Sequence, residues 1–440
     1  MTEKHITWFE SATLGERYCR ITLPGLPAIY VFPKDLTNTH ALAAIKYGSI
    51  DRRFRPHGRK DYIEVPDGVA HFLEHRMFTD KDGRDVFERF AALGADANAY
   101  TSYDRTIYHF NCTENFETAF GLLLQMLTHP YFSAELVERE QGIIAQEIGM
   151  YEDDPGDVCY QNLLSAMYHI HPVRVNVCGT VESISRITPE LLYDCHSTFY
   201  SAPNMVVILC GRVDPESVAR IVAENIPATE AGEPRRFWYE EPAEVAGRRV
   251  TARRQVSKPV FAIGVKNTDI SPDQTTRLKE QLLHRILNHM IFAASGELYN
   301  SLYDQGLITA PLAYSYEAVP SGGFSHVVVT GAAWLPDEVF RRTQEYISAL
   351  RTRGIDKADF ERGRRVLLSR IISQYDSTER TAHAMIDSAF RGLDIFDEQL
   401  LAEELTSEDA EVLLRKFYKD DKFVLSVVCP PKHTNQRKDN

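Results

Sequence analysis

Residues 188–211, TPELLYDCHSTFYSAPNMVVILCG, share a pattern with residues 406–429, TSEDAEVLLRKFYKDDKFVLSVVC. Each block reads as a capped helix followed by a strand. Four residue types recur at a constant offset of 218 positions, at Thr188 and Thr406, Glu190 and Glu408, Phe199 and Phe417, and Tyr200 and Tyr418. Because this offset is about half of the 440-residue chain, the repeat predicts a duplicated domain rather than a chance match.

The two halves are expected to meet at residues 228–247, ATEAGEPRRFWYEEPAEVAG, where prolines, glycines and glutamates show no periodicity and indicate a linker. The predicted domains are therefore 1–227 and 248–440. Pairs of strands between helices favour an α+β sandwich over a regular βαβ repeat. The expected strands are 17–32, 41–48, 97–102, 106–112 and 204–210, and the expected helices are 68–78, 84–93, 114–128, 133–153, 188–199, 272–292, 335–352 and 356–376.

The composition excludes several classes of protein. Hydrophobic residues make up 44% of the chain and charged residues 25%, as in soluble globular proteins. The net charge of -13 would repel phosphate backbones, so nucleic acid is not an expected partner. No apolar run reaches the roughly 18 residues that a membrane span needs, and the first residues lack a signal pattern, so we expect a cytoplasmic protein without membrane contact. Seven scattered cysteines without a CxxC pair indicate reduced thiols.

Residues 68–78, GVAHFLEHRMF, carry two histidines and a glutamate in an apolar helix. At about 100° per residue, His75 lies about 40° around the helix from His71, and Glu74 lies about 60° to the other side. Two imidazoles one turn apart can bind one zinc ion, and the glutamate can take a proton from a water molecule that the metal activates. This H-x-x-E-H spacing is the inverted zincin pattern. The alternative is a pair of core or capping histidines, so the zinc interpretation requires a third ligand.

The helix expected at 133–153 offers two candidates for that ligand. On a helical wheel with Glu140 at 0°, Glu147 falls about 20° away. Five apolar residues lie within about 60° of Glu140: Leu136, Val137, Ile143, Ile144 and Tyr151. A carboxylate on an apolar face costs several kcal/mol unless a cation or hydrogen bonds compensate it. We expect one of the two glutamates to bind the metal and the other to orient the ligands. The spacing leaves open which is which.

These residues together resemble the pitrilysin/insulinase family of zinc metallopeptidases, family M16. HFLEH is followed by the two glutamates seven apart, and GADANAYTSYDRTIYHF (94–110) is similar to the family's Gly-x-x-x-Asn-Ala-x-Thr segment. The resemblance implies two homologous α/β-sandwich halves of the metallopeptidase LuxS/MPP-like fold, forming a clamshell with a zinc motif in the first half alone. It implies zinc ligands His71, His75 and Glu147, general base Glu74, a supporting carboxylate Glu140, and an edge strand with Asn98, Ala99 and Thr101 on which substrate adds as another strand.

One stretch departs from the family pattern. Active members commonly carry, in the second half, an arginine and a tyrosine seven residues apart that contact the substrate and the reacting carbonyl. In LYNSLYDQGLITAPLAYSY (298–316) the arginine position holds Tyr303, while Tyr314 and Tyr316 follow at other spacings. Tyr314 is the expected substrate contact. The loss of the arginine would weaken oxyanion stabilisation, which contributes a few kcal/mol to acyl transfer.

Two functions follow from the resemblance. The first is a zinc endopeptidase that hydrolyses peptides or unfolded segments. The second is a peptide-binding or maturation subunit with weak or partner-dependent proteolysis. A lyase on a related zinc fold is a third reading, disfavoured by the length of the duplicated chain. Within the family, the chain looks closest to a cytoplasmic bacterial branch associated with aminopentanol modification of elongation factor P. That branch implies a homodimer, or a heterodimer with a paralogous M16-like chain.

Overall fold

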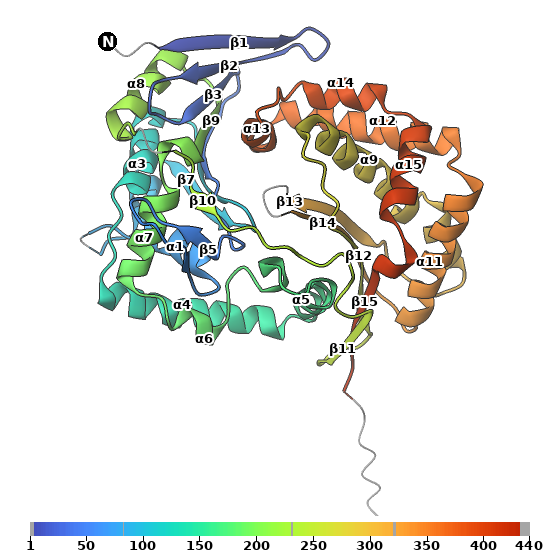
Figure 1. Ribbon diagram of the computed structural model, residues 1–440. Helices are drawn as coiled ribbons and strands as arrows, with labels where there is room; N and C mark the ends of the chain where they lie inside the picture. The colour runs from blue at the N-terminus through green and yellow to red at the C-terminus, as the bar shows by residue number, and fades with distance from the viewer. Residues whose placement is uncertain (1–3, 82, 230–231, 320–322, 432–440) are drawn as a thin grey trace, which may run out of the picture. The chain divides into compact units, whose positions relative to one another are not determined.

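The computed structural model describes residues 4–81, 83–229, 232–319 and 323–431, and its chain forms two compact units (Figure 1). The first unit contains the described residues of Met1–Ile148, Asn176–Trp238 and Leu368–Leu401. The second unit contains those of Gly149–Val175, Tyr239–Leu367 and Ala402–Asn440. Each unit combines a mostly antiparallel sheet with helices, so the expected α+β class is confirmed.

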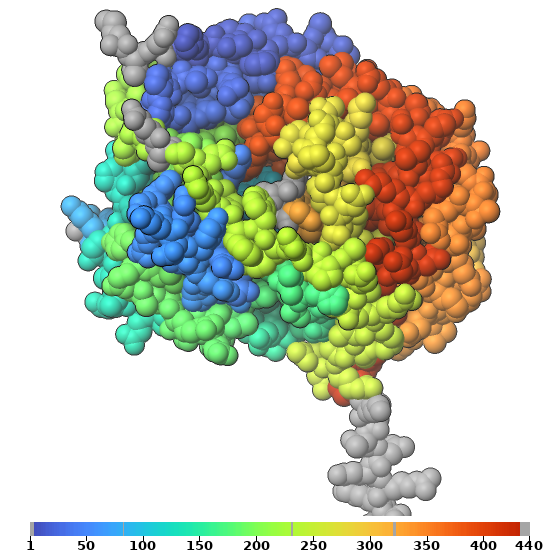
Figure 2. Space-filling model, in the orientation of Figure 1, coloured from blue at the N-terminus to red at the C-terminus, as the bar shows by residue number. Residues whose placement is uncertain are grey.

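The first unit has a seven-stranded sheet in the order β1-β2-β3-β9-β4-β8-β7. Its strands are β1 (His5–Ser11), β2 (Glu16–Thr22), β3 (Ala28–Pro33), β9 (Met205–Gly211), β4 (Thr39–Ile45), β8 (Thr106–Cys112) and β7 (Ala95–Thr101). Among the described strands of this sheet, β3 and β9 alone pair in parallel. Strand β7 lies at one edge and β1 at the other. The space-filling view shows the first residues of the chain, in dark blue, at the surface (Figure 2). Trp8 of β1 is exposed. A small second sheet joins β5 (Arg53–Arg55), β6 (Ile63–Glu64) and β10 (Arg235–Arg236).

The central strands of this sheet are buried on both faces. Successive side chains of a strand point to opposite faces, so β4 contributes to two cores. Ala41, Ala43 and Ile45 join a core that includes the residues of α1 (Val69–Met77) and α3 (Phe116–Thr128). Leu42 and Ala44 join a separate core with α13 (Thr378–Arg391). The other helices of the unit are α2 (Val86–Ala92), most of α4 (Ala134–Asp153), α6 (Val181–Ile184), α7 (Pro189–Phe199) and α8 (Pro215–Asn225).

The second unit repeats the central part of this architecture. Its sheet has the order β11-β15-β12-β14-β13, from β11 (Arg249–Arg253), β15 (Phe423–Cys429), β12 (Val260–Asn267), β14 (Phe324–Ala332) and β13 (Ala313–Val319). Strands β11 and β15 are parallel and the other pairs are antiparallel, as in the series β3-β9-β4-β8-β7. Its helices include α5 (Pro155–Met167), α9 (Gln274–Phe292), α10 (Glu297–Asp304), α11 (Pro336–Arg353), most of α12 (Lys357–Ser373) and α15 (Ser407–Phe417), and α14 (Asp397–Glu404) spans the boundary between the units.

The repeated sequence blocks fold alike, as the duplication predicts. The Thr188 side chain caps α7 and the Thr406 side chain caps α15, and each accepts a backbone N–H from the third residue of its helix. A short 3-10 turn then leads into β9 or β15. The matching elements keep the offset found in the sequence, because β9 begins at Met205 and β15 at Phe423.

Each sequence repeat contributes a helix to the unit that is formed mainly by the other repeat. The two units therefore do not coincide with the sequential halves 1–227 and 248–440. Helix α5, from the first repeat, packs on β12 and β15 of the second unit, while α13, from the second repeat, packs on β4 and β9 of the first. Each exchanged helix covers a sheet face that would otherwise expose apolar side chains. The expected linker 228–247, of which 230–231 lie outside the described residues, also takes part in the fold through β10.

Several elements were not expected from the sequence. They include β1, α5 and α8 and, in the second repeat, α10, α13, β13 and β14. The single strand expected at 17–32 divides into β2 and β3 around a turn that contains Gly25. Helices α5 and α8 both begin with an aspartate cap followed by a proline, at Asp154-Pro155 and Asp214-Pro215. That signal was available, because proline is favoured in the first turn of a helix. Among the described residues no helix is long and apolar enough to span a membrane.

Candidate metal centre and active site

Helix α1 is fixed in the core of the first unit by its first turn. Gly68, the residue before it, has a φ of 89°, and a Cβ atom there would lie 2.4 Å from the carbonyl oxygen of Cys178. Only glycine fits both that left-handed conformation and that close approach. Phe72 and Leu73 are fully buried. The backbone that carries the two histidines is therefore held rigidly on both sides.

The structure brings His71 and His75 of α1 together with Glu147 of α4. One ligand atom from each lies within 4.8 Å of the others. His71 Nε2 is 3.7 Å from Glu147 Oε1, and His75 Nε2 is 3.6 Å from Glu147 Oε2. These distances are too long for hydrogen bonds, whereas two ligands of a tetrahedral zinc ion at about 2.0–2.1 Å lie about 3.3 Å apart. The three side chains are therefore spaced as ligands of one metal ion.

The protonation of the histidines also fits a metal. Burial and the neighbouring His75 lower the pKa of His71 to about 3, so its imidazole is neutral and has a lone pair to offer. Its Nδ1 is buried without a hydrogen-bond partner among the described residues. Burial lowers the pKa of His75, but the hydrogen bond that His75 donates to Glu140 and the charges of Glu74 and Glu147 raise it overall. A cation would be favoured here in place of that proton.

Glu140 supports His75 from the side away from Glu147. Its Oε1 is 3.1 Å from His75 Nδ1, and its Oε2 accepts a hydrogen bond of 3.1 Å from Arg76 Nη1. Burial raises the pKa of Glu140, but the hydrogen bonds from His75 and Arg76 lower it overall. The bond to Nδ1 leaves His75 Nε2 directed to the metal position, as carboxylates behind ligand histidines commonly do.

Arg76 is a part of the site that sequence reasoning missed. It is completely buried, and its Nη1 also donates to Thr79 Oγ1. Its position immediately after His75, in a helix whose residues are nearly all buried, was the available signal. A buried guanidinium requires a carboxylate, and Glu140 is that carboxylate.

Glu74 lies on the same helix face with its own support. The side chain is 8% exposed, and Thr101 Oγ1 of β7 donates a 2.6 Å hydrogen bond to its Oε2. The pKa of Glu74 is raised overall, because the effect of burial exceeds that of the hydrogen bond from Thr101, which lowers it. A carboxylate with a raised pKa is a better proton acceptor near neutral pH. Thr101, expected to contact substrate, is here a partner of the candidate base.

The buried face of α4 is narrower than the angular positions of its residues predicted. The buried residues are Val137, Glu140, Ile144 and Ile148. Ile143 and Tyr151, expected in the stripe, are exposed, so that part of the prediction was wrong. The core contacts only the side of the helix centred on Glu140 and Ile144. Glu147 therefore lies at the margin of the buried face, with a side chain that is 26% exposed, where a ligand can remain accessible to water.

The other expected substrate contacts are distributed over both units. Asn98 and Ala99 lie on β7, the edge strand, and Asn98 Oδ1 accepts a hydrogen bond from the Ala99 N–H. Tyr314 lies on β13 of the second unit, where its hydroxyl is 3.0 Å from His289 Nδ1. Tyr303, at the position of the missing arginine, is exposed on α10. The first unit by itself thus contains the metal candidates and the edge strand, and Tyr314 is outside it.

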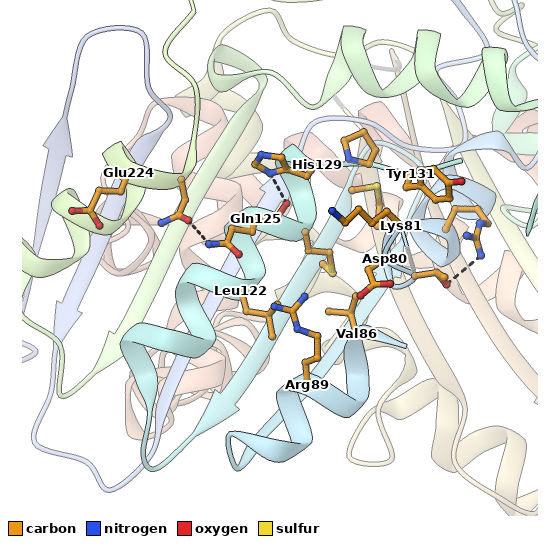
Figure 3. Close-up of a pocket in the computed structure, with 15 residues that line it drawn as sticks. Asp80, Lys81, Val86, Arg89, Leu122, Gln125, His129, Tyr131 and Glu224 are labelled. Atoms are coloured by element: carbon orange, nitrogen blue, oxygen red, sulfur yellow. Dashed lines mark hydrogen bonds between the residues drawn. The ribbon is translucent and has the colours of Figure 1, made fainter. Parts of the chain in front are cut away.

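A pocket of about 650 Å³ opens beside α1, α2 and α3 in the first unit (Figure 3). Lys81, Arg89, Gln125, His129 and Glu224 are among the residues that line it. Arg76 and Met77 of α1 reach its wall, whereas His71, His75 and Glu147 do not. The candidate metal centre is therefore separate from this pocket.

Comparison with known proteins agrees with this geometry. Residues 63–181 match the model of insulinase (peptidase family M16), and residues 186–367 match that of the peptidase M16 inactive domain. An uncharacterized zinc protease of Bacillus subtilis, YmfH, is 36% identical over 91% of this chain and 94% of its own length. An uncharacterized zinc protease of Mycobacterium leprae, ML0855, is 28% identical over 78% of this chain and 75% of its own.

Solved structures show the same relationship. The crystal structure of an M16-like peptidase from Alicyclobacillus acidocaldarius has a TM-score of 0.90 and 33% identity, and the match covers 96% of this chain and all of the other. Pitrilysin, at 18% identity, shares the fold with a TM-score of 0.76, and the match covers 97% of this chain and 46% of pitrilysin. With its two family domains in order and a near full-length relative above one-third identity, the chain belongs to the insulinase family, peptidase family M16.

Proposed function

We propose that this protein is a zinc-dependent endopeptidase that hydrolyses peptides or unfolded polypeptide segments. The observation that carries the proposal is the convergence of His71, His75 and Glu147, with Glu74 beside them on the same helix. Two histidines and one carboxylate are the ligand set of catalytic zinc sites in metallopeptidases. The family membership and the relatives named as zinc proteases support the same activity.

In the proposed reaction, His71, His75 and Glu147 would hold the zinc ion, and Glu74 would accept and donate the proton. A bound zinc ion acidifies water and polarises a carbonyl oxygen. Glu74 accepts the proton of the attacking water and delivers it to the leaving amine. Thr101 keeps the Glu74 carboxylate in position through its 2.6 Å hydrogen bond. Glu140 and Arg76 fix the orientation of His75.

Strand β7 is the proposed platform for the substrate. It pairs only with β8 in the described sheet, so its outer edge presents backbone groups to which an extended peptide can add. Thr101, at the end of this strand, bonds to Glu74, so a peptide paired with β7 would run towards the proposed base. Main-chain pairing of this kind tolerates many side chains, which fits a substrate class of unfolded segments.

The test uses the full chain and its Glu74→Gln variant. We expect one tightly bound zinc ion per chain at the α1–α4 centre in both proteins, and cleavage of a mixed peptide library by the wild type only, read by mass spectrometry. Glu114→Gln, an exposed glutamate outside the site, is the matched control and should cleave normally. Cleavage by Glu74→Gln at the wild-type rate would refute the role of Glu74. Loss of zinc from Glu74→Gln would show that the carboxylate is a ligand instead.

A second function is favoured by one specific observation. The position of the family's arginine is occupied by Tyr303, and the hydroxyl of Tyr314 is already engaged by His289. Without those groups the same site would bind peptides with slow turnover, as a maturation subunit beside a paralogous M16-like chain. Tight peptide binding without products would favour this function, and cleavage by the isolated chain would exclude it. The dimeric state, the cytoplasmic location and the link to elongation factor P stay predictions.

A further inference from the structure

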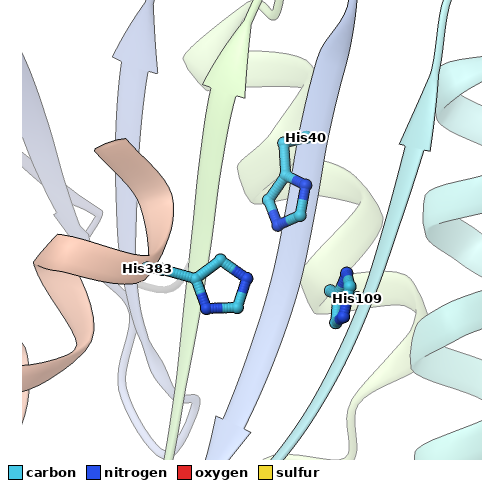
Figure 4. A group of neighbouring side chains, drawn as sticks. All are labelled: His40, His109 and His383. Carbon is cyan, nitrogen blue, oxygen red and sulfur yellow. The ribbon is translucent and has the colours of Figure 1, made fainter. Parts of the chain in front are cut away.

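A second cluster of histidines lies in the first unit, on the sheet face opposite α1. His40 comes from β4, His109 from β8 and His383 from α13. Leu42 and Ala44 alternate with the α1-facing residues of β4 and pack against α13, so His40 points to the α13 side. Figure 4 shows the three rings gathered between α13 and the two strands. None of the three residues belongs to the proposed catalytic site.

The three imidazoles form a compact triangle. The centroids of the His40 and His109 rings, of the His40 and His383 rings, and of the His109 and His383 rings are each 5.3 Å apart. One nitrogen of each ring lies within 4.8 Å of a nitrogen of the other two. Nitrogens bound to one tetrahedral zinc ion lie about 3.3 Å apart, so small rotations of the rings would complete the geometry.

Each ring keeps one buried nitrogen without a hydrogen-bond partner among the described residues: His40 Nε2, His109 Nδ1 and His383 Nε2. His40 Nδ1 donates to Asn111 Oδ1 at 2.8 Å, and His383 Nδ1 is 3.2 Å from the Tyr100 hydroxyl. The bond to an amide oxygen leaves the lone pair of His40 on Nε2. Buried polar atoms normally find a partner, so three orphaned nitrogens in one cluster indicate a missing group.

The electrostatic environment of the three histidines favours a cation as the missing group. Burial lowers the pKa of His40 to about 3, and burial also lowers the pKa of His109 and His383, so the three rings are neutral donors. The charged groups that act on them are acidic, Glu379 on α13 and Asp96 on β7. A neutral trio of imidazoles is a ligand set for zinc and related divalent transition metals.

We propose that His40, His109 and His383 bind a second divalent transition-metal ion, zinc by ligand type, which fastens α13 to β4 and β8. Helix α13 comes from the second repeat and covers the sheet of the first, so the ion would link the two repeats within one unit. His40 is fully buried, while His109 and His383 are partly exposed, which gives the ion a path of entry. Asn111 and Tyr100 would hold two of the ligand rings from behind.

The experiment uses the full chain with His71→Ala and His75→Ala, so that only the second cluster can bind. Zinc chloride is titrated by calorimetry, and cobalt chloride by the visible absorption of tetrahedral cobalt. We expect one equivalent of zinc and a rise in Tm on its addition. His109→Gln and His383→Gln, made separately in the same background, should each weaken binding at least 100-fold and remove the rise in Tm. The control His129→Gln changes an exposed histidine elsewhere and should bind as the background does.

A background chain that takes up no zinc at micromolar concentrations would overturn the proposal. So would unchanged binding by both His109→Gln and His383→Gln. If the double alanine background does not fold, the otherwise wild-type chain is used, with two equivalents of metal expected and one in His383→Gln; two in both proteins would also overturn it. Failure of this site would leave the catalytic proposal untouched, because that proposal depends on other residues.

Discussion

Thr101 donates a hydrogen bond of 2.6 Å to Glu74 and thereby connects the edge strand β7 to the helix that carries the candidate metal ligands. Glu74 is buried and Thr101 is half-buried. The bond joins the strand proposed to pair with substrate to the carboxylate proposed to move the proton. The position of the substrate and the position of the proposed base are therefore coupled through the hydroxyl group of Thr101.

Removal of that hydroxyl should slow catalysis without loss of the metal. We expect Thr101→Val to lower kcat about 10–100-fold, the usual effect of removing a group that orients an active-site residue. KM and zinc content should stay near the wild-type values, because no ligand is changed. Thr101→Ser, which restores the hydroxyl, should recover most of kcat. A Thr101→Val enzyme with normal kcat would show that Glu74 does not depend on this bond.

Glu140 is predicted to determine zinc affinity through His75. Glu140→Gln weakens the acceptor for His75 Nδ1 and leaves the buried Arg76 without its counter-charge. We expect zinc affinity to fall about 10–100-fold and the free energy of unfolding to fall by about 3 kcal/mol. Competition with a chromophoric chelator and denaturant unfolding measure the two effects. Glu138→Gln, exposed on the same helix, is the control, and equal affinity in both variants would contradict the prediction.

The sequence contained most of the candidate catalytic site but little of the domain exchange. The positions of His71, Glu74 and His75 follow from helical spacing alone, and Glu147 and Glu140 follow from a second helix. Spacing within one helix is a local property, so the sequence is enough to predict it. Which glutamate faces the metal depends on how α4 packs, and wheel geometry left that open.

Long-range pairing accounts for what was missed. Nothing in residues 155–167 or 378–391 indicates which sheet each helix covers, because both are amphipathic and both sheets offer an apolar face. The histidine cluster has the same origin. His40, His109 and His383 are far apart in the sequence and form no motif. The pairing of β4 with β8 and the packing of α13 on β4 and β9 bring them together.

The docking of α5 in the second unit is predicted to depend on a glycine. A Cβ atom at Gly264 of β12 would lie 2.5 Å from Met167 Sδ and 3.1 Å from a methyl group of Leu163. Gly264→Ala should therefore lower the free energy of unfolding by about 1–3 kcal/mol through overpacking. The same change at Gly142, in the middle of α4 with no atom within 4 Å of the added group, should raise it by about 0.5–1 kcal/mol. Equal effects in thermal unfolding would contradict this account of the interface.

A buried ion pair in the second unit gives a pH-dependent prediction. Lys266 Nζ is 2.6 Å from Glu241 Oε1, and their side chains are 0% and 2% exposed. The carboxylate also accepts the backbone N–H groups of residues 169–171. Burial raises the pKa of Glu241, but the hydrogen bonds from Lys266 and these three N–H groups lower it overall. The pKa of Lys266 is lowered overall, because the effect of burial exceeds that of its hydrogen bond to Glu241, which raises it. Each charge therefore depends on its partner.

Because the pKa of Glu241 is lower in the folded chain, its contribution to stability is complete above the unfolded value of about 4.3 and is lost as pH falls through the folded value. At pH 7 we expect Glu241→Gln to lower the free energy of unfolding by about 3–5 kcal/mol, since Lys266 keeps its charge without a counter-ion. Below about pH 4.3 the deficit should shrink, because Glu241 then takes up a proton in the unfolded chain while it stays ionised in the folded one. It should vanish once the pH falls below the lower folded value, where the wild-type side chain is neutral as well. Denaturant unfolding of both proteins across this range measures the difference, with the exposed Glu240→Gln as control. A deficit that stays constant down to pH 3 would mean that Glu241 contributes by packing and not by its charge.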